Sequence, residues 1–177
     1  MINKAYKFAL EAHEAVGQLR KYTKEPYIVH PANVARFVSS VTRDKEVIQA
    51  AYLHDTVEDT LVTFGDIEKH FGARVRRLVA DVTKVSTKDN GLRIHRIALD
   101  HKHYAMASAN GKSIKLADMI DNMPSIIEFD PKFAIKYMAE KRELLPLLDL
   151  GHPTLYTKAQ GIINAYYAQT DSLEISA

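Results

Sequence analysis

An adjacent histidine and aspartate, His54 and Asp55, offer an imidazole nitrogen and a carboxylate oxygen that could bind one metal ion. Neighbouring side chains on an α-helix point about 100° apart, so the two converge only on an ion that lies between their directions, near a helix end. Glu58 and Asp59 follow four residues after them. If the helix continues, both acids lie one turn further along the same face, beside the ion without having to bind it.

Two further residues fit the same site. His30 precedes Pro31, which disfavours α geometry at His30, so we expect His30 at the start of a helix with its imidazole free to turn inward. Asp118 lies in the apolar stretch 114–120, where a carboxylate is unfavourable unless it is paired, hydrogen-bonded or metal-bound. Asn122 follows Asp118 by one helical turn.

Together these residues form a candidate metal site of two imidazoles and two carboxylates: His30, His54, Asp55 and Asp118. This donor set suits a single Mn²⁺, Fe²⁺, Co²⁺ or Zn²⁺ ion, with positions left for water and a phosphate oxygen. Such an ion lowers the pKa of bound water and neutralises charge on a phosphoryl group. Glu58 and Asp59 could then orient and deprotonate that water.

Each member also has an ordinary structural interpretation. His30 could cap a helix, and Asp118 could be the buried ion-pair partner of Lys115. Glu58 and Asp59 could be solvated acids at a helix end. The joint pattern is more specific than any of its members, and it favours phosphate chemistry at a metal ion.

The elements that must position these residues are helices, because the hydrophobic spacing is helical almost throughout. The predicted helices cover about 2–16, 31–41, 44–53, 63–71, 73–84, 92–109, 113–126, 131–148 and 153–169. Gly111 is expected to separate two of them, and no strand of useful length or glycine-rich phosphate loop is present. We therefore expect one all-α domain of eight or nine helices over residues 1–177, with a frayed tail from about 171.

Composition excludes several other classes of protein. The chain has 177 residues and no cysteine, so disulfides, thiolate metal sites and cysteine nucleophiles are excluded. A net charge of +2 is too small to indicate nucleic-acid binding. No segment is apolar enough for a signal peptide or a membrane span, so we expect a cytoplasmic protein without a membrane partner. The sequence leaves a homodimer open.

The sequence segments around these residues form a longer pattern: AHEAVGQLRKYTKEPYIVHP at 12–31, AAYLHDTVEDT at 50–60, FG at 71–72, VRRLVADVTK at 75–84 and IKLADMIDN at 114–122. This pattern closely resembles the hydrolase domain of the Rel/Spo family within the HD metal-dependent phosphohydrolases. The resemblance is strong over residues 1–84 and 113–126 and general elsewhere. Long members of that family add further domains, whereas a chain of this length looks like a free-standing small alarmone hydrolase.

The resemblance implies a function, a cofactor and roles for particular residues. It implies removal of pyrophosphate from the 3′ position of guanosine tetra- or pentaphosphate, (p)ppGpp, usually with Mn²⁺. It implies metal ligands at the four residues named above, with Glu58 and Asp59 acting on the attacking water. It also implies that Arg20 and Lys21 lie against the guanine base, and that Asn122 contacts the ribose or the 3′-phosphate.

Physical chemistry is compatible with these contacts and leaves alternatives. The planar guanidinium of Arg20 stacks well on a purine, although Arg20 and Lys21 could equally belong to a solvated loop. Tyr27 could line the pocket or serve packing. Lys115 could meet a phosphate or be an ordinary exposed lysine, and Lys84 could reach distal phosphates or remain solvated.

Three functional hypotheses remain at this point. The first is a metal-dependent (p)ppGpp hydrolase that releases GDP or GTP and pyrophosphate. The second keeps the metal and changes the substrate to NADPH, an adenine alarmone or a nucleoside monophosphate. The third is a domain that binds nucleotide without turnover. The sequence of segment 86–111 departs from that of the longer enzymes of the family, which leaves the base and the number of phosphates of the preferred substrate undecided.

Overall fold

The structure, a computed structural model, describes residues 2–174, with side chains described up to residue 170. The elements follow the chain in this order: α1 (Ile2–Ala15), α2 (Val29–Val41), α3 (Lys45–Leu53), α4 (Thr56–Asp59), α5 (Phe64–Phe71), α6 (Ala73–Val82), the 3-10 helix η1 (Lys88–Asn90), α7 (Arg93–Ala105), α8 (Ala109–Phe129), α9 (Pro131–Leu144), the 3-10 helix η2 (Leu145–Leu148) and α10 (Pro153–Glu174). The described part of the chain contains no strand, so the all-α prediction is confirmed.

Several helix boundaries follow from local capping. Asp44 accepts hydrogen bonds from the backbone N–H groups of Glu46 and Val47 and so starts α3. Thr63 and Asp66 cap the start of α5 reciprocally, as a capping box. Gly72 ends α5 at a φ of 90°, a backbone conformation that glycine adopts without strain. These starts and stops agree with the sequence predictions.

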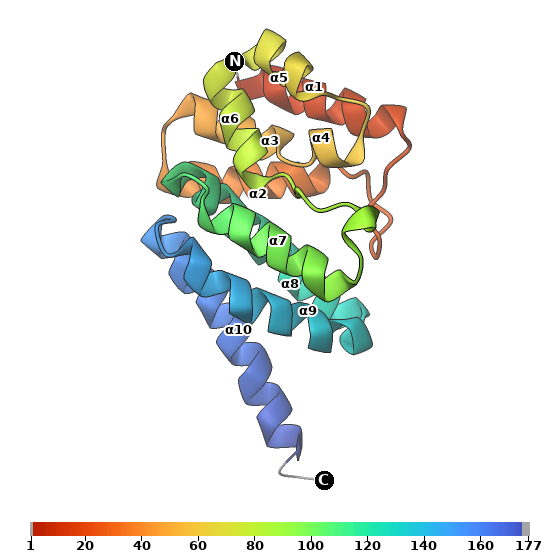
Figure 1. The fold of residues 1–177 in the computed structure, drawn as a ribbon, viewed down its shortest axis with the longest axis vertical. Helices are drawn as coiled ribbons and strands as arrows, with labels where there is room; N and C mark the ends of the chain where they lie inside the picture. Colours follow the sequence, from red (N-terminus) through yellow and green to blue (C-terminus); the bar gives the residue numbers. More distant parts are fainter. Residues whose placement is uncertain (1, 175–177) are drawn as a thin grey trace.

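Helix α8 is the central element of the fold. It packs against α2, α3, α6, α9 and α10. Figure 1 shows α1–α6 gathered at one end of the molecule, α9 and α10 at the other, and α7 crossing between them. The core residues Leu53, Leu116, Met119 and Met123 are fully buried. Burial of each such side chain contributes about 1.5–3 kcal/mol, so the helix that carries Asp118 is held firmly in place.

The second helix begins two residues earlier than predicted, whereas the third ends where it was predicted to end. His30 is the second residue of α2 and lies within the helix, because Pro31 occupies the first turn, where a backbone N–H has no intrahelical partner. The helix after Asp44 agrees with the predicted range 44–53, so the condition that it continue to Glu58 and Asp59 is not met. It ends at Leu53, and α4 restarts as a single turn with Asp55 at its N-cap position.

Gly111 does not separate two helices as predicted. Helix α8 begins at Ala109, because the Ser108 side chain accepts a hydrogen bond from the Gly111 N–H and caps it. A Cβ at position 111 would lie 2.6 Å from the Asp81 side chain. Glycine is therefore required here by a close approach between α6 and α8.

The C-terminal helices also differ in extent from the prediction. The segment predicted as one helix over 131–148 divides into α9 and η2. Helix α10 continues to Glu174, past the expected end near 169, and the rest of the expected tail, 175–177, lies outside the described residues. Within residues 2–174, no helix is long and apolar enough to span a bilayer.

Candidate metal centre and substrate cavity

Three separate parts of the fold bring four side chains to one point. His30 projects from α2, His54 and Asp55 lie at the break between α3 and α4, and Asp118 projects from α8. The Nε2 atom of His30 lies 3.2 Å from Nε2 of His54, 3.3 Å from Oδ2 of Asp55 and 3.3 Å from Oδ1 of Asp118. The break in the helix lets two adjacent side chains, His54 and Asp55, face the same point. We call these four side chains the metal centre.

Hydrogen bonds on the far side of each ring fix the histidine tautomers. His54 Nδ1 lies 2.9 Å from the Ala51 carbonyl, which can only accept, so Nδ1–H is the donor. His30 Nδ1 lies 2.6 Å from Oδ2 of Asp121, and in the neutral ring it likewise donates to this carboxylate. Both rings can therefore turn an Nε2 lone pair toward the shared point, as metal ligands do.

The spacing and burial of the donor atoms fit a shared ion. Two ligands about 2.1 Å from one ion at right angles lie about 3.0 Å apart. The His54 Nε2 to Asp55 Oδ2 distance is 3.1 Å, close to that value, while Oδ1 of Asp118 lies 4.0 Å from His54 Nε2. His30 and His54 are 1% and 2% exposed, so solvent cannot satisfy these groups. His30, His54 and Asp55 form the only such cluster found among the described residues.

The electrostatics of the metal centre favour a cation. Burial opposes protonation of His30, but hydrogen bonds to Asp118, Asp121 and Asp55 outweigh it and hold the His30 pKa well above 6.5. Burial tends to raise the pKa of Asp55, but the neighbouring histidines hold that pKa well below its usual range. The site therefore concentrates negative charge around one point, which a metal ion would neutralise.

Asp118 forms the ion pair with Lys115 that was its ordinary structural interpretation, and its other oxygen faces the candidate metal site. Its Oδ2 atom lies 2.8 Å from Nζ of Lys115, a buried ion pair. Its Oδ1 atom faces His30 and accepts a hydrogen bond of 2.6 Å from Asn122 Nδ2. Burial tends to raise the Asp118 pKa, but Lys115 and His30 hold it well below 3.8. Lys115 is thus mostly buried and paired with Asp118, and the ordinary exposed-lysine alternative is excluded.

Tyr27 supports the metal centre from the side of Asp55. Its hydroxyl donates a hydrogen bond of 2.7 Å to Asp55 Oδ2, and its ring packs edge-on against His30. Burial, reinforced by the charges of Asp55 and Asp59, raises the Tyr27 pKa, so the hydroxyl keeps its proton and remains a donor. Tyr27 also lines the neighbouring cavities, so both of the roles considered for it are present.

The two acids after the metal centre are held by different partners. Glu58 forms an ion pair with Lys84 and accepts a hydrogen bond from its backbone N–H, 3.3 Å away. Asp59 accepts a hydrogen bond of 2.9 Å from Gln18 Nε2, and Gln18 Oε1 lies 2.6 Å from His13 Nδ1. A chain of hydrogen bonds thus runs from the buried His13 through Gln18 to Asp59.

The loop between α1 and α2 carries Arg20 and Lys21 to the site. Arg20 donates a hydrogen bond of 3.0 Å to Asn122 Oδ1 and pairs with Asp121 at 3.3 Å. Lys21 is exposed and pairs with Asp130 at 3.1 Å. Arg20 is therefore not part of a solvated loop, and its contacts brace the part of α8 that orients His30.

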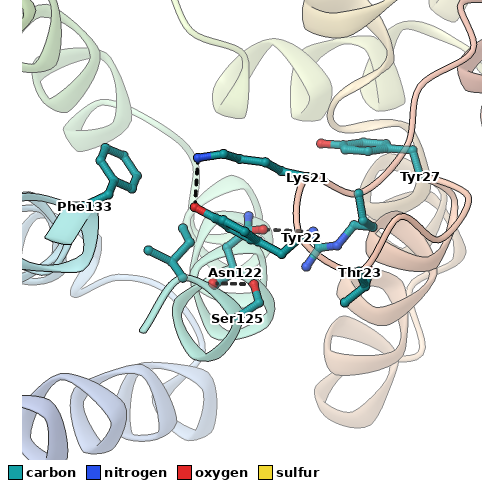
Figure 2. A pocket seen from close by; sticks show the side chains of 9 residues that line it. Lys21, Tyr22, Thr23, Tyr27, Asn122, Ser125 and Phe133 are labelled. Carbon is teal, nitrogen blue, oxygen red and sulfur yellow. Dashed lines mark hydrogen bonds between the residues drawn. The ribbon is translucent and has the colours of Figure 1, made fainter. Parts of the chain in front are cut away.

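An aromatic pocket of about 360 Å³ opens beside this loop. We define the aromatic pocket by its lining residues: Arg20, Lys21, Tyr22, Thr23, Tyr27, Asn122, Ser125, Ile126 and Phe133. Figure 2 shows Tyr22 and Lys21 extending between Tyr27 on one side and Phe133 on the other, with Asn122 and Ser125 beneath them. Flat aromatic faces beside hydrogen-bonding side chains are suited to a planar heterocycle.

A larger cavity of about 560 Å³ adjoins the aromatic pocket and shares Lys21, Tyr27, Asn122, Ile126 and Phe133 with it. It reaches Asp55 and Asp118 of the metal centre, together with Glu58 and Asp59. Its lining also includes six cationic side chains: Lys21, Lys84, Arg93, Arg96, Lys115 and Lys141. We call it the cationic cavity. The same lining carries six carboxylates, Asp55, Glu58, Asp59, Asp100, Asp118 and Glu140, so its formal charges balance. Its volume and its cations suit a ligand with more than one phosphate once a bound cation offsets the carboxylates of the metal centre.

Some of these residues escaped the sequence analysis. Asp121 orients His30, and the only indication of it in the sequence was its position in the segment IDN at 120–122. Gln18 lies in the loop two residues before Arg20, where a polar side chain is unremarkable. Arg93 and Arg96 come from the segment 86–111, whose departure from the family pattern gave no indication of which residues would line the cavity.

Comparisons with known proteins agree with this geometry. A family model described as HD domain matches residues 5–142. A guanosine-3′,5′-bis(diphosphate) 3′-pyrophosphohydrolase, MESH1, of Xenopus tropicalis is 42% identical over 136 residues, which are 75% of this chain and 73% of that protein. A guanosine-3′,5′-bis(diphosphate) 3′-pyrophosphohydrolase of Aquifex aeolicus is 36% identical over 146 residues, 81% of this chain but only 20% of that protein. The chain thus spans about a fifth of the Aquifex relative.

A solved structure gives the same picture at the level of the fold. The structure of a metazoan ortholog of SpoT, described as hydrolysing ppGpp, superposes with a TM-score of 0.84 at 29% sequence identity. The match covers 93% of this chain and 94% of that one. Nearly all of the helical arrangement described above is therefore shared with that protein.

Proposed function

This chain belongs to the HD-domain family, and from that premise we propose that it is a metal-dependent 3′-pyrophosphohydrolase of guanosine 3′,5′-bis(diphosphate), ppGpp. The reaction would convert ppGpp and water to GDP and pyrophosphate, and pppGpp to GTP and pyrophosphate. The observation that carries the proposal is the opening of the metal centre into a cavity with six cationic side chains and an adjoining aromatic pocket. Relatives whose names state this reaction support it.

We propose His30, His54, Asp55 and Asp118 as the ligands of one divalent ion. Two imidazoles and two carboxylates suit Mn²⁺, with Zn²⁺, Fe²⁺ and Co²⁺ as alternatives. When bound, such an ion lowers the pKa of a coordinated water and withdraws charge from a phosphate oxygen. Asp121 and Tyr27 hold His30 and Asp55 in the orientation that this binding requires.

Glu58 and Asp59 are proposed to act on the attacking water. Asp59 is aligned by Gln18, and its carboxylate lines the cavity next to the metal centre. A carboxylate there can accept a proton from water as the new oxygen–phosphorus bond forms at the 3′-linked phosphate. The bond from that phosphorus to the ribose 3′ oxygen breaks, and the oxygen leaves as a hydroxyl once it is protonated. Lys84, paired with Glu58, lies where it can balance the charge of the phosphates.

The remaining contacts are assigned from the two cavities. The aromatic pocket is proposed to take the guanine base between Tyr22, Tyr27 and Phe133, with Lys21 at its rim. Arg20 acts mainly by bracing Asn122 and Asp121, because both of its short contacts are to them. Asn122 lines both cavities and is placed between base and phosphates, where a ribose would lie. Lys115 contributes through Asp118.

The test is incubation of metal-stripped protein with ppGpp, with and without Mn²⁺, followed by separation of the nucleotide and phosphate products. GDP and pyrophosphate in equal amounts, formed only with the metal, are expected. The His54→Ala variant should lose this turnover, and hydrolysis that survives in it undiminished would refute the proposed mechanism. Release of orthophosphate, or turnover only of NADPH, an adenine alarmone or a nucleoside monophosphate, would support the other substrate class.

A further inference from the structure

The cations of the cationic cavity fall into two groups. Four of those six side chains form an ion pair with a carboxylate: Lys21 with Asp130, Lys84 with Glu58, Arg93 with Glu140, and Lys115 with Asp118. Arg96 and Lys141 form no such pair with any described residue. Arg96 and Lys141 thus line one cavity without a carboxylate in direct contact, although Asp118 and Glu140 act on Lys141 at longer range.

The guanidinium of Arg96 has a buried nitrogen that lacks a hydrogen-bond partner. Arg96 lies in α7 one turn after Arg93, whose guanidinium binds Glu140 through two hydrogen bonds of 2.8 and 2.7 Å. The buried nitrogen of Arg96 is its Nε atom. A buried N–H without an acceptor is destabilising, so a ligand that supplies an oxygen would remove a penalty that the free protein carries.

Lys141 is the corresponding cation on α9. Its ammonium lies 4.7 Å from the centre of the Tyr137 ring, a contact that attracts a cation without neutralising it. Burial, together with the charge of Lys115, lowers the Lys141 pKa to about 8. Lys141 lines the same cavity as Asp55 and Asp118 of the metal centre. An anion bound beside Lys141 would offset both causes of that shift.

The proposed substrate has two phosphorylated ends, and the metal centre can take only one of them. The 3′-diphosphate must lie at the metal centre, next to Lys84 and Lys115, for hydrolysis to occur there. The 5′-phosphates then need a separate anion site in the same cavity. Lys84 and Lys115 are already assigned to the 3′-diphosphate, and the other two paired cations, Lys21 and Arg93, would each have to give up a carboxylate to bind a further phosphate.

We propose that Arg96 and Lys141 form the site for the 5′-phosphates of the nucleotide and set the preference for substrates phosphorylated at both ends. This inference rests on the proposed function and extends it to two residues in α7 and α9. Arg96 offers a planar fork of donors to phosphate oxygens, and Lys141 adds a point charge. The two residues contact neither the metal centre nor the 3′ linkage, so they act on binding and not on the chemical step.

The test compares substrates with and without 5′-phosphates in two variants. Arg96→Gln and Lys141→Met should each raise KM for ppGpp about tenfold, with kcat nearly unchanged. Neither variant should change KM for guanosine 3′-diphosphate, which lacks the 5′-phosphates and still carries the 3′ linkage. Lys136→Met, on the exposed side of α9, is the matched control and should leave both KM values unchanged.

Each outcome bears on a different statement. Unchanged KM for ppGpp in both variants would overturn the 5′-phosphate site, as would an equal rise for ppGpp and guanosine 3′-diphosphate. Unaltered turnover of guanosine 3′-diphosphate in the variants shows that they fold. Absence of ppGpp turnover in the unaltered protein would refute the proposed function itself, whereas turnover with unchanged variant KM refutes only the site.

Discussion

The sharpest test of the metal centre is a change to Asp121, a residue outside the proposed ligand set. Asp121→Asn replaces one carboxylate oxygen by an amide of the same shape. In the present structure, His30 Nδ1–H donates to Asp121 at 2.6 Å, and this fixes the ring with Nε2 toward the metal centre. An asparagine either accepts this hydrogen bond more weakly or presents its NH₂ group to the ring. In the second case the proton moves to Nε2, and His30 can no longer bind a metal ion.

The size of the effect follows from the strength of this contact. A hydrogen bond to a charged group contributes about 1.5–3 kcal/mol, and a short, buried one belongs toward the upper part of that range. Arg20 shares the same carboxylate at 3.3 Å and weakens the pull of Asp121 on the imidazole, which argues against the upper limit. Loss of such an outer partner weakens metal binding by about 10–100-fold. We expect about 30-fold.

The assay is the affinity for Mn²⁺, measured by competition with a chelator of known affinity at fixed pH. Asp130→Asn is the matched control, since Asp130 also accepts hydrogen bonds, from Lys21 and Tyr22 of the aromatic pocket, but none from a proposed metal ligand. The control should retain the unaltered affinity within twofold. An Asp121→Asn protein that is folded and binds Mn²⁺ as tightly as the control would refute the role assigned to Asp121.

Three further predictions test the surroundings of the metal centre. Tyr27→Phe removes the 2.7 Å hydrogen bond to Asp55 and should weaken Mn²⁺ binding about fivefold in the same competition assay; unchanged affinity would contradict this role. Gln18→Leu removes the hydrogen bond to Asp59 and should lower kcat about fivefold while the affinity for Mn²⁺ stays the same. A fall in Mn²⁺ affinity with unchanged kcat would argue against a role of Gln18 in aligning Asp59. The pKa of His30 is raised, so a proton competes with the metal ion for this ring at every pH below that pKa. Mn²⁺ affinity should therefore rise about tenfold per pH unit upward from pH 6.5 and then level off. An affinity independent of pH would be inconsistent with His30 as a ligand.

The sequence predicted the helical class and singled out the four side chains that the fold brings together, because helical spacing and unusual residue types are visible in short segments. Helix starts at Asp44 and Thr63 follow from capping chemistry within three residues. A histidine next to an aspartate, and a carboxylate in an apolar stretch, indicate chemistry without knowledge of the fold. The end of the helix at Leu53 agrees with the predicted range, but the single turn α4 was not predicted, since hydrophobic spacing over four residues does not identify a helix.

The residues missed by the sequence analysis depend on contacts between distant parts of the chain. Gln18 meets Asp59 across 41 residues, and Arg93 meets Glu140 across 47. Nothing in the local sequence around Arg96 shows that its buried Nε lacks a hydrogen-bond acceptor, because that depends on how the helices pack. Polar contacts between separate helices are therefore where structure adds most to the sequence.

The proposed ligands come from α2, from the α3–α4 break and from α8, so a bound ion would tie together segments that lie as far apart as residues 30 and 118. The unfolded chain has no such arrangement, and occupancy of the site therefore becomes part of the folding equilibrium. An ion at 100 times its dissociation constant would add about 2.7 kcal/mol to the free energy of unfolding. The abundance of the folded protein would then follow the supply of the metal as well as the expression of the gene.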